Sequence, residues 1–211
     1  MVREREVPPE PVELKVANGL PWLESRALFR RWWSTARLGF GGSRRVVAGL
    51  GTAEPVGSAA IFLALTVWIP GVIATIVTVA VSSLVLRGDA SGAAFPKHPM
   101  LVMGYLVTLP LPVLLAAAGS AWFARRSVRG GFERAFPIVC FTSGGLVLGA
   151  VPILGGLIGA LVWTQCALRG VLSASPSTRA PTATMIGVCF LLMQGLSMVI
   201  GSMLWILGFM I

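Results

Sequence analysis

The sequence predicts an all-α fold, a polytopic integral membrane bundle of about five transmembrane helices preceded by an amphipathic interfacial helix. Composition indicates a membrane protein, because 55% of the 211 residues are hydrophobic and only 12% are charged, with a mean hydropathy of +0.83. Soluble domains carry about 25% charged residues. Four windows without any charged side chain are long enough to cross a bilayer as helices. They are residues 55–86, 99–124, 137–168 and 180–211.

Three regions follow one another along the chain. Residues 1–20 are rich in Glu, Pro and Val and contain no long apolar run, so we expect a disordered tail. Residues 21–50 are predicted to be a cytoplasmic amphipathic region, and residues 51–211 a transmembrane domain. The chain lacks a basic segment followed by a short apolar run and a small-residue cleavage site, so the first span is expected to direct membrane insertion.

The amphipathic region has an apolar face at helical spacing. The residues that recur at i, i+3, i+4, i+7 and i+11 are Phe29, Trp32, Trp33, Ala36 and Phe40. Arg30, Arg31, Ser34 and Arg37 point elsewhere. This pattern predicts a helix in the membrane interface, with its tryptophans at headgroup depth and its arginines facing lipid phosphates. The alternative is a cytoplasmic cap packed on the protein's own helices.

The first apolar window, residues 55–86, allows one span kinked at Pro70 or two half-spans that meet at Pro70 and Gly71. Charge distribution favours one span. Nine basic residues then precede it, four lie between residues 125 and 134, and two follow the hairpin on the same side, whereas only Arg87 and Lys97 lie opposite. The positive-inside rule therefore predicts five crossings, a cytoplasmic N-terminus and an external C-terminus.

The second window, residues 99–124, is predicted to be one crossing that returns to the basic side. The third, residues 137–168, is about 48 Å long as a straight helix, against a hydrocarbon core of about 30 Å. Pro152 lies near its midpoint, just before Gly155 and Gly156, so we expect a helical hairpin. Its arms of about 24 Å each are predicted to cross fully, and a re-entrant hairpin is the alternative. Gly145, Gly149, Gly155 and Gly159 form two GxxxG pairs that are expected to hold the arms together.

Catalytic and metal-binding chemistry are not expected. The predicted spans contain no Asp, Glu, Lys, Arg or His, whereas proton relays and coupled ion sites use such residues. His98 is the only histidine, and Cys140, Cys166 and Cys189 lie in separate apolar segments without a CxxC pair. We therefore predict a non-enzyme with no cofactor, no metal and no catalytic residue.

The net charge of +9 favours anionic lipid headgroups as partners over nucleic acid, because the basic residues lie beside apolar spans. The candidate contact residues for lipid or an acidic partner are Arg125, Arg126, Arg129, Glu133, Arg134, Arg30, Arg31, Trp32 and Trp33. A simpler interpretation of the 125–134 cluster is that it only sets membrane topology.

Several short motifs occur in a recognisable order. They are Pro21-Trp22 near the start, Gly130-Gly131-Phe132-Glu133 before the hairpin, Pro152 with Gly155 and Gly156 at its turn, Trp163 and Gly170 in its second arm, and Arg179-Ala180 before the last span. This order resembles the Yip family, the Ypt/Rab-interacting proteins and their prokaryotic relatives. Many bacterial members have a P-W-E entry, whereas here Leu23 separates Trp22 from Glu24.

The resemblance implies five spans and a membrane adaptor, assembly or membrane-organising role for other membrane components. Eukaryotic members bind prenylated Rab GTPases, whereas bacterial members mostly lack an assigned function. The Arg-, Ala- and Gly-rich composition is typical of a high-GC bacterial protein, so we expect a bacterial-type member in the inner membrane. Its expected partners are anionic lipids and another membrane protein or complex, and self-association into homo-oligomers stays open.

Two other function classes remain open. A small transporter or channel for apolar or lipidic cargo would use Pro70, Pro110, Pro112 and Pro152 as breaks in helices that line a path. A membrane enzyme that acts on lipids would need His98, or the cluster from Arg125 to Glu133, as its acid or base.

Overall fold

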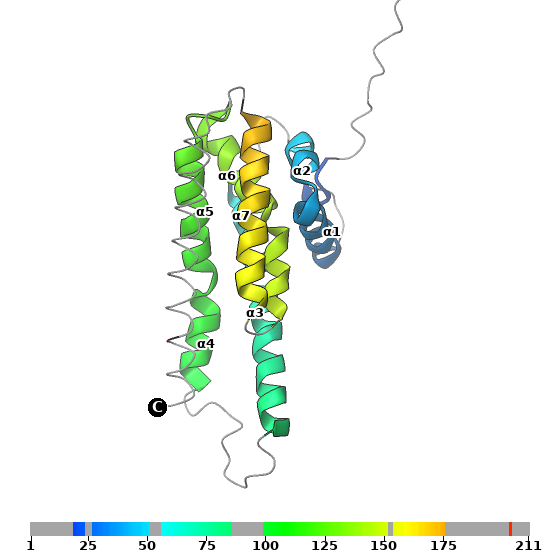
Figure 1. The fold of residues 1–211 in the computed structure, drawn as a ribbon, viewed down its shortest axis with the longest axis vertical. Helices are drawn as coiled ribbons and strands as arrows, with labels where there is room; N and C mark the ends of the chain where they lie inside the picture. Colours follow the sequence, from blue (N-terminus) through cyan, green and yellow to red (C-terminus); the bar gives the residue numbers. More distant parts are fainter. Residues whose placement is uncertain are drawn as a thin grey trace, which may run out of the picture.

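Every regular element in the described part of the computed structural model is a helix, which confirms the all-α fold class there (Figure 1). The structure describes residues 19–23, 27–50, 56–85, 99–151, 154–175 and 203. The elements are η1 (Pro21–Leu23), α1 (Leu28–Gly41), α2 (Ser43–Gly49), α3 (Val56–Val85), α4 (Pro99–Thr108), α5 (Pro110–Ala124), α6 (Gly131–Phe141), η3 (Ser143–Ala150) and α7 (Gly155–Ala174). The predicted disordered tail lies outside the described residues, except for its last two.

Three helical stretches are long and apolar enough to cross a membrane: Val56–Val81, Val102–Ala124 and Gly155–Ala174. This is consistent with a membrane protein. The number of five crossings stays a prediction, because the last window, residues 180–211, lies outside the described residues apart from Met203. His98, Pro152, Arg179, Ala180 and Cys189 also lie outside them.

Helix α3 is a single element of 30 residues that continues through Pro70. At 1.5 Å per residue it is about 45 Å long. The first window therefore holds one helix and not two half-spans. Near this proline, the Thr66 hydroxyl oxygen accepts a hydrogen bond from the Trp32 indole N–H at 3.1 Å.

Helix α5 leads through a short turn into α6, and η3 continues α6 before the chain returns as α7 (Figure 1). The end of α5, the start of α6 and the end of α7 lie at the same end of the bundle (Figure 1). We call this end, marked by Arg125, Arg126, Arg129 and Arg134, the basic end.

The hairpin is confirmed as two arms packed together, but its boundaries differ from the prediction. Pro137 lies inside α6, so the first arm begins at Gly131, and the second continues past Arg169 to Ala174. The 11 residues of α6 and 8 of η3 span about 32 Å with the larger rise of a 3₁₀ helix. The 20 residues of α7 span about 30 Å. The prediction of 24 Å arms was wrong because it ended each helix at the nearest charged residue, whereas α6 and α7 both contain charged residues near one end.

Glycines bring the arms of the hairpin into backbone contact, as the GxxxG spacing predicts. A Cβ on Gly159 would lie 2.8 Å from the carbonyl oxygen of Gly145, and one on Gly145 would lie 2.7 Å from Val162. Trp163 is fully buried, and its indole N–H donates to the Val139 carbonyl at 2.9 Å. This bond fastens α7 to α6.

Helix α1 corrects the prediction for Trp32. Only 3% of Trp32 is exposed, and Thr35, Ala36 and Gly39 are buried with it. Gly39 lies against the backbone of Phe141 at the end of α6. This face of α1 packs on the protein's own helices, which was the alternative left open above, so the Trp32 side chain does not face lipid headgroups.

Candidate functional site

The loop at the basic end is built by two glycines. Gly130 and Gly131 have φ angles of 96° and 65°, a left-handed conformation that residues with a Cβ rarely adopt. Val128 is buried, with 5% exposed, and its backbone N–H donates to the Ala124 carbonyl at 3.2 Å. The Gly-Gly pair thus reverses the chain between α5 and α6, while Val128 anchors the loop.

Aromatic side chains from α5 and α6 support the arginines of this loop. The Arg125 guanidinium lies 3.2 Å from the centroid of the Trp122 ring, and Trp122 meets Phe132 edge-on at 6.4 Å. Phe132 stacks on Phe136 at 5.5 Å. A cation on an indole face is attracted by the ring quadrupole. This contact holds the Arg125 charge close to the end of the bundle.

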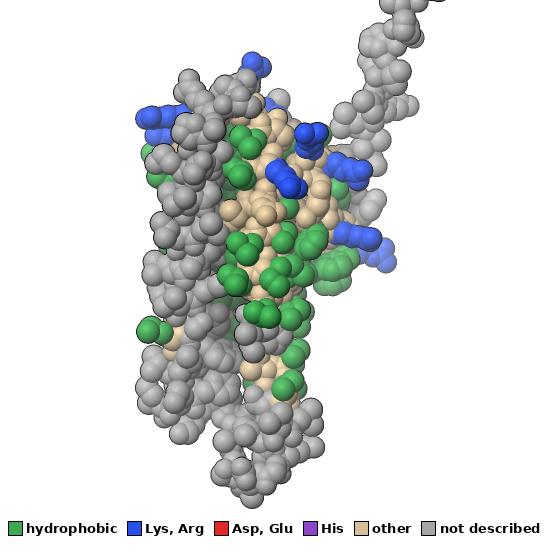
Figure 2. All heavy atoms as spheres, in the orientation of Figure 1, with side chains coloured by type: hydrophobic (Ala, Val, Ile, Leu, Met, Phe, Trp, Pro, Cys, Tyr) green, Lys and Arg blue, Asp and Glu red, His purple; other side chains and the backbone are tan. Residues whose placement is uncertain are grey.

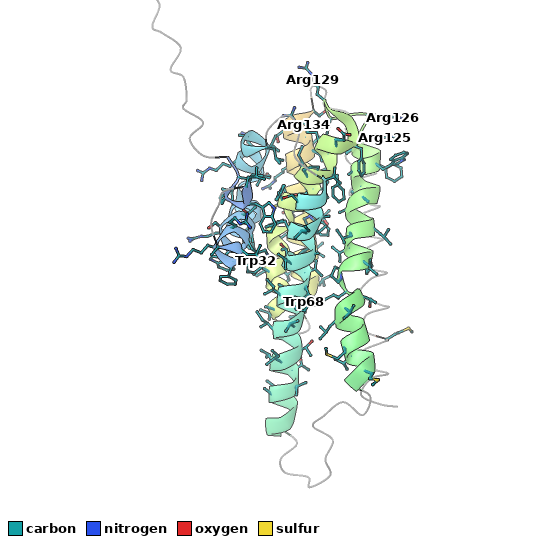
Figure 3. All side chains as sticks on the ribbon, turned by 180° about the vertical axis from the view of Figure 1, so that it is seen from behind. Trp32, Trp68, Arg125, Arg126, Arg129 and Arg134 are labelled. Carbon is teal, nitrogen blue, oxygen red and sulfur yellow. The ribbon has the colours of Figure 1, made fainter. Side chains whose placement is uncertain are left out.

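The four arginines of the loop and of α6 gather at this end (Figure 3). Arg126 and Arg129 are exposed, as is Glu133, whereas Arg125 and Arg134 are partly buried. The Nε atom of Arg134 is buried and has no hydrogen-bond partner among the described residues. Sequence reasoning predicted the cluster, and the structure brings its members together.

A second basic group lies on the α1–α2 pair. Arg30, Arg37, Arg44 and Arg45 are exposed there. Figure 2 shows the blue side chains confined to the half of this face that is nearer the basic end. Arg31 is partly buried: its guanidinium carbon lies 5.5 Å from the centroid of the Trp22 ring, and its Nη1 donates to the Trp22 carbonyl at 3.5 Å.

The other aromatic residues of α1 are exposed. Phe29, Trp33 and Phe40 are 65%, 47% and 45% exposed. They lie on one flank of the buried face of α1 and form an apolar edge. Contact between this edge and lipid stays a prediction.

Two tryptophan hydrogen bonds fasten the N-terminal segment to α3. The Trp22 indole N–H donates to the Ser58 hydroxyl at 2.6 Å, and that of Trp32 donates to Thr66 Oγ1 at 3.1 Å. Thr66 in turn donates to the Phe62 carbonyl at 2.7 Å. Sequence reasoning missed these pairs. A usable signal existed, since Ser58 and Thr66 are polar residues two turns apart in an apolar helix.

The residues of the motif resemblance are mostly structural where they are described. Pro21 and Trp22 lie in η1, with Trp22 buried, and Gly155 is buried at the start of α7, followed by the partly buried Gly156. A Cβ on Gly170 would lie 2.9 Å from the Ile138 side chain, so glycine is needed for α7 to approach α6.

Among the described residues, no group of three His, Cys, Asp or Glu side chains could hold a metal ion. Cys140 and Cys166 are buried and do not pair with each other; Cys166 Sγ lies 3.5 Å from the Phe40 carbonyl oxygen.

No protein-family model, curated protein or solved structure matches the chain. The Yip resemblance therefore rests on the motifs alone and stays a prediction.

Proposed function

We propose that this chain is a non-enzymatic membrane adaptor or membrane-organising protein that acts through its basic end. The observation that carries the proposal is the convergence of Arg125, Arg126, Arg129 and Arg134 at one end of the bundle (Figure 3). Trp122 is 55% exposed beneath Arg125. An indole below a guanidinium suits the boundary between acyl chains and phosphates.

Anionic lipid headgroups are the first ligands of this surface in our proposal. Each basic residue near an anionic membrane surface contributes about 1 kcal/mol of attraction, and a guanidinium can bind a phosphate through two parallel N–H donors. The exposed Arg126 and Arg129 are free to reach lipid or an acidic segment of a partner protein. The partly buried Arg134 would contribute mainly long-range attraction.

The proposed topology places the basic end and the N-terminus in the cytoplasm and the C-terminus outside. The steep asymmetry of basic residues supports it. Assignment to the bacterial Yip-like proteins and to the bacterial inner membrane is part of the same proposal. It is supported by the motif order and by the Gly130–Gly131 turn.

Copurification tests the adaptor role. The tagged protein is extracted from native membranes in mild detergent, and its companions are quantified by mass spectrometry. A variant with Arg125, Arg126 and Arg129 changed to Ala is compared with a matched control in which Arg37, Arg44 and Arg45 are changed to Ala. Both variants lose three charges, so they differ only in where the charge is removed.

We expect one membrane protein or complex to copurify with the wild type and with the control, and to be lost from the 125/126/129 variant. Equal recovery from both variants would mean that the basic end does not select the partner. Recovery of the chain alone in all three samples would overturn the adaptor proposal.

A small transporter of apolar or lipidic cargo is the second candidate. The interruption between α4 and α5 at Leu109 and Pro110 lies beside Gly71 of α3, and an interrupted helix at membrane depth is typical of transporters. Flux of a fluorescent lipid in proteoliposomes, compared between wild type and a Pro110→Ala/Pro112→Ala variant, tests this candidate. No flux above empty vesicles would remove it.

A further inference from the structure

The hairpin formed by α6, η3 and α7 turns beside the middle of α3. A Cβ on Gly149, near the end of the first arm, would lie 3.8 Å from the Cβ of Pro70. Pro70 lies midway along the 30 residues of α3. Val151 and Leu154 flank the turn and are 56% and 61% exposed.

The length of the arms does not decide how deeply the hairpin enters the membrane. Arms of about 32 and 30 Å equal the hydrocarbon thickness of about 30 Å. They would fit a full crossing, and they would equally fit a half-crossing that continues into the headgroup layer and beyond. The position of the turn relative to α3 is the informative observation.

Helix α3 continues for about 22 Å beyond Pro70, as far as Val85. This half of the helix exposes Ile73, Ile76 and Val81 at 44%, 62% and 52%. If the turn reached the far membrane surface, these side chains would stand in water. Exposed apolar surface costs about 25 cal/mol per Å², so α3 favours a placement that keeps both of its halves in the bilayer.

Placing the midpoint of α3 at the bilayer midplane also brings the basic end to the headgroup layer. The total α3 length of about 45 Å matches a bilayer of about 40–45 Å with its headgroups, which puts Pro70 near the midplane. Leu109, just before α5, contacts Gly71, so α5 starts at the same depth. Its 15 residues rise about 22 Å and bring Trp122 and Arg125 to the headgroup layer.

The described residues on both sides of the turn are suited to a lipid environment. The backbone N–H of Gly155 donates to the Val151 carbonyl at 3.2 Å, that of Ile158 to Leu154 at 3.0 Å, and that of Val151 to Leu148 at 2.9 Å. Backbone at membrane depth requires internal partners of this kind. The exposed side chains around the turn are apolar as well, since Leu157 and Ile158 are 51% and 47% exposed.

We infer that the hairpin is a re-entrant element that enters from the basic side and turns near the bilayer midplane. Its exposed residues Val151, Leu154, Leu157 and Ile158 then contact the ends of lipid acyl chains. This inference does not depend on the adaptor role, because it concerns membrane depth alone.

Cysteine accessibility tests the inference. Single cysteines are placed at Val151 and Leu154 in a chain whose native cysteines are changed to Ala, and a membrane-impermeant maleimide is added to intact cells. Lys97→Cys, in the charged segment between the apolar windows 55–86 and 99–124, reports the far face. Arg129→Cys reports the basic end. We expect the two turn positions to stay unlabelled under conditions that label Lys97→Cys, whereas labelling of the turn together with Lys97→Cys would overturn the inference.

A charge at the turn gives a second test in the native chain. Leu154→Arg would place a guanidinium near the midplane, where a charge is strongly disfavoured, so we expect most of the folded protein to be lost from membranes. The matched control is Phe123→Arg, at a position that is 44% exposed between Trp122 and Arg125 at the headgroup layer, and this variant should accumulate normally. Equal amounts of both variants would show that Leu154 lies in water and would overturn the inference.

Discussion

Trp32 and Trp33 are neighbours in the chain, yet they lie in opposite environments. Trp32 is buried and donates its indole N–H to Thr66, whereas Trp33 is 47% exposed. Helical periodicity places both on a broad apolar face, since it does not distinguish a face covered by protein from one covered by lipid. The environment of each residue depends on the partner helix, which sequence patterning does not specify.

We predict that Trp32→Phe lowers stability by about 1 kcal/mol, because it removes a buried hydrogen bond while keeping an aromatic ring. Thermal unfolding in detergent measures the effect. Trp33→Phe is the control and should unfold at the wild-type temperature. In the double variant Trp32→Phe/Thr66→Val, the losses should be less than additive. Full additivity would contradict an interaction between the two side chains.

Gly159 is a residue whose small size determines a helix contact. Gly159→Val should destabilise the protein by about 1–3 kcal/mol through overpacking, because its Cβ would lie 2.8 Å from the Gly145 carbonyl oxygen. Gly119→Ala in α5 is the control, since nothing lies within 4 Å of its Cβ position. We expect both variants to keep their helix content and only Gly159→Val to unfold at a lower temperature. An unchanged temperature would argue against close packing of the arms.

At the scale of elements, charge-free windows located the helices from α3 to α7 but not their ends. The window that begins at residue 137 missed the first turns of α6, because Glu133 and Arg134 lie inside that helix. Such windows report compatibility with hydrocarbon, whereas helix ends depend on local backbone geometry, here the left-handed Gly130 and Gly131. The hairpin itself was predictable from its central proline and glycines, since those residues interrupt helices for a local reason.

The turn at the basic end should be sensitive to its glycine conformations. Gly130→Ala forces a Cβ into a φ of 96°, a strain of roughly 1–2 kcal/mol. It would also bring that Cβ to 3.1 Å from the Arg134 side chain. We expect a lower unfolding temperature and greater proteolysis between α5 and α6. Gly41→Ala, which has open space around it, is the control, and equal behaviour of the two variants would contradict the strained turn.

At the scale of the whole molecule, the sequence predicted well that the described arginines from Arg125 to Arg134 gather at one end. The reason is that the positive-inside pattern acts on loops during insertion and does not require knowledge of packing. The depth of the hairpin was not predictable in the same way. A full crossing and a re-entrant turn leave the loops on the same sides of the membrane, so the charge pattern does not distinguish the two. The inferred re-entrant turn depends on the position of Gly149 beside Pro70.

Lipid retention should depend on the basic end. In native mass spectrometry from mixed anionic and zwitterionic lipid, we expect the Arg125/Arg126/Arg129→Ala variant to retain several-fold less anionic lipid than the wild type, since each lost charge removes about 1 kcal/mol of attraction. Retention of zwitterionic lipid should not change. An equal loss of both lipid types would indicate damage to the fold and not to headgroup recognition.

The contacts of the N-terminal segment with α3 have a mechanical consequence. Trp22 and Trp32 bind Ser58 and Thr66, both before Pro70, and the hairpin also turns beside Pro70. The described residues therefore occupy more area on the basic side of Pro70 than beyond it. A protein with a larger cross-section on one side of the bilayer midplane spreads one leaflet more than the other, and we propose that the described part favours membrane that bulges toward the basic end.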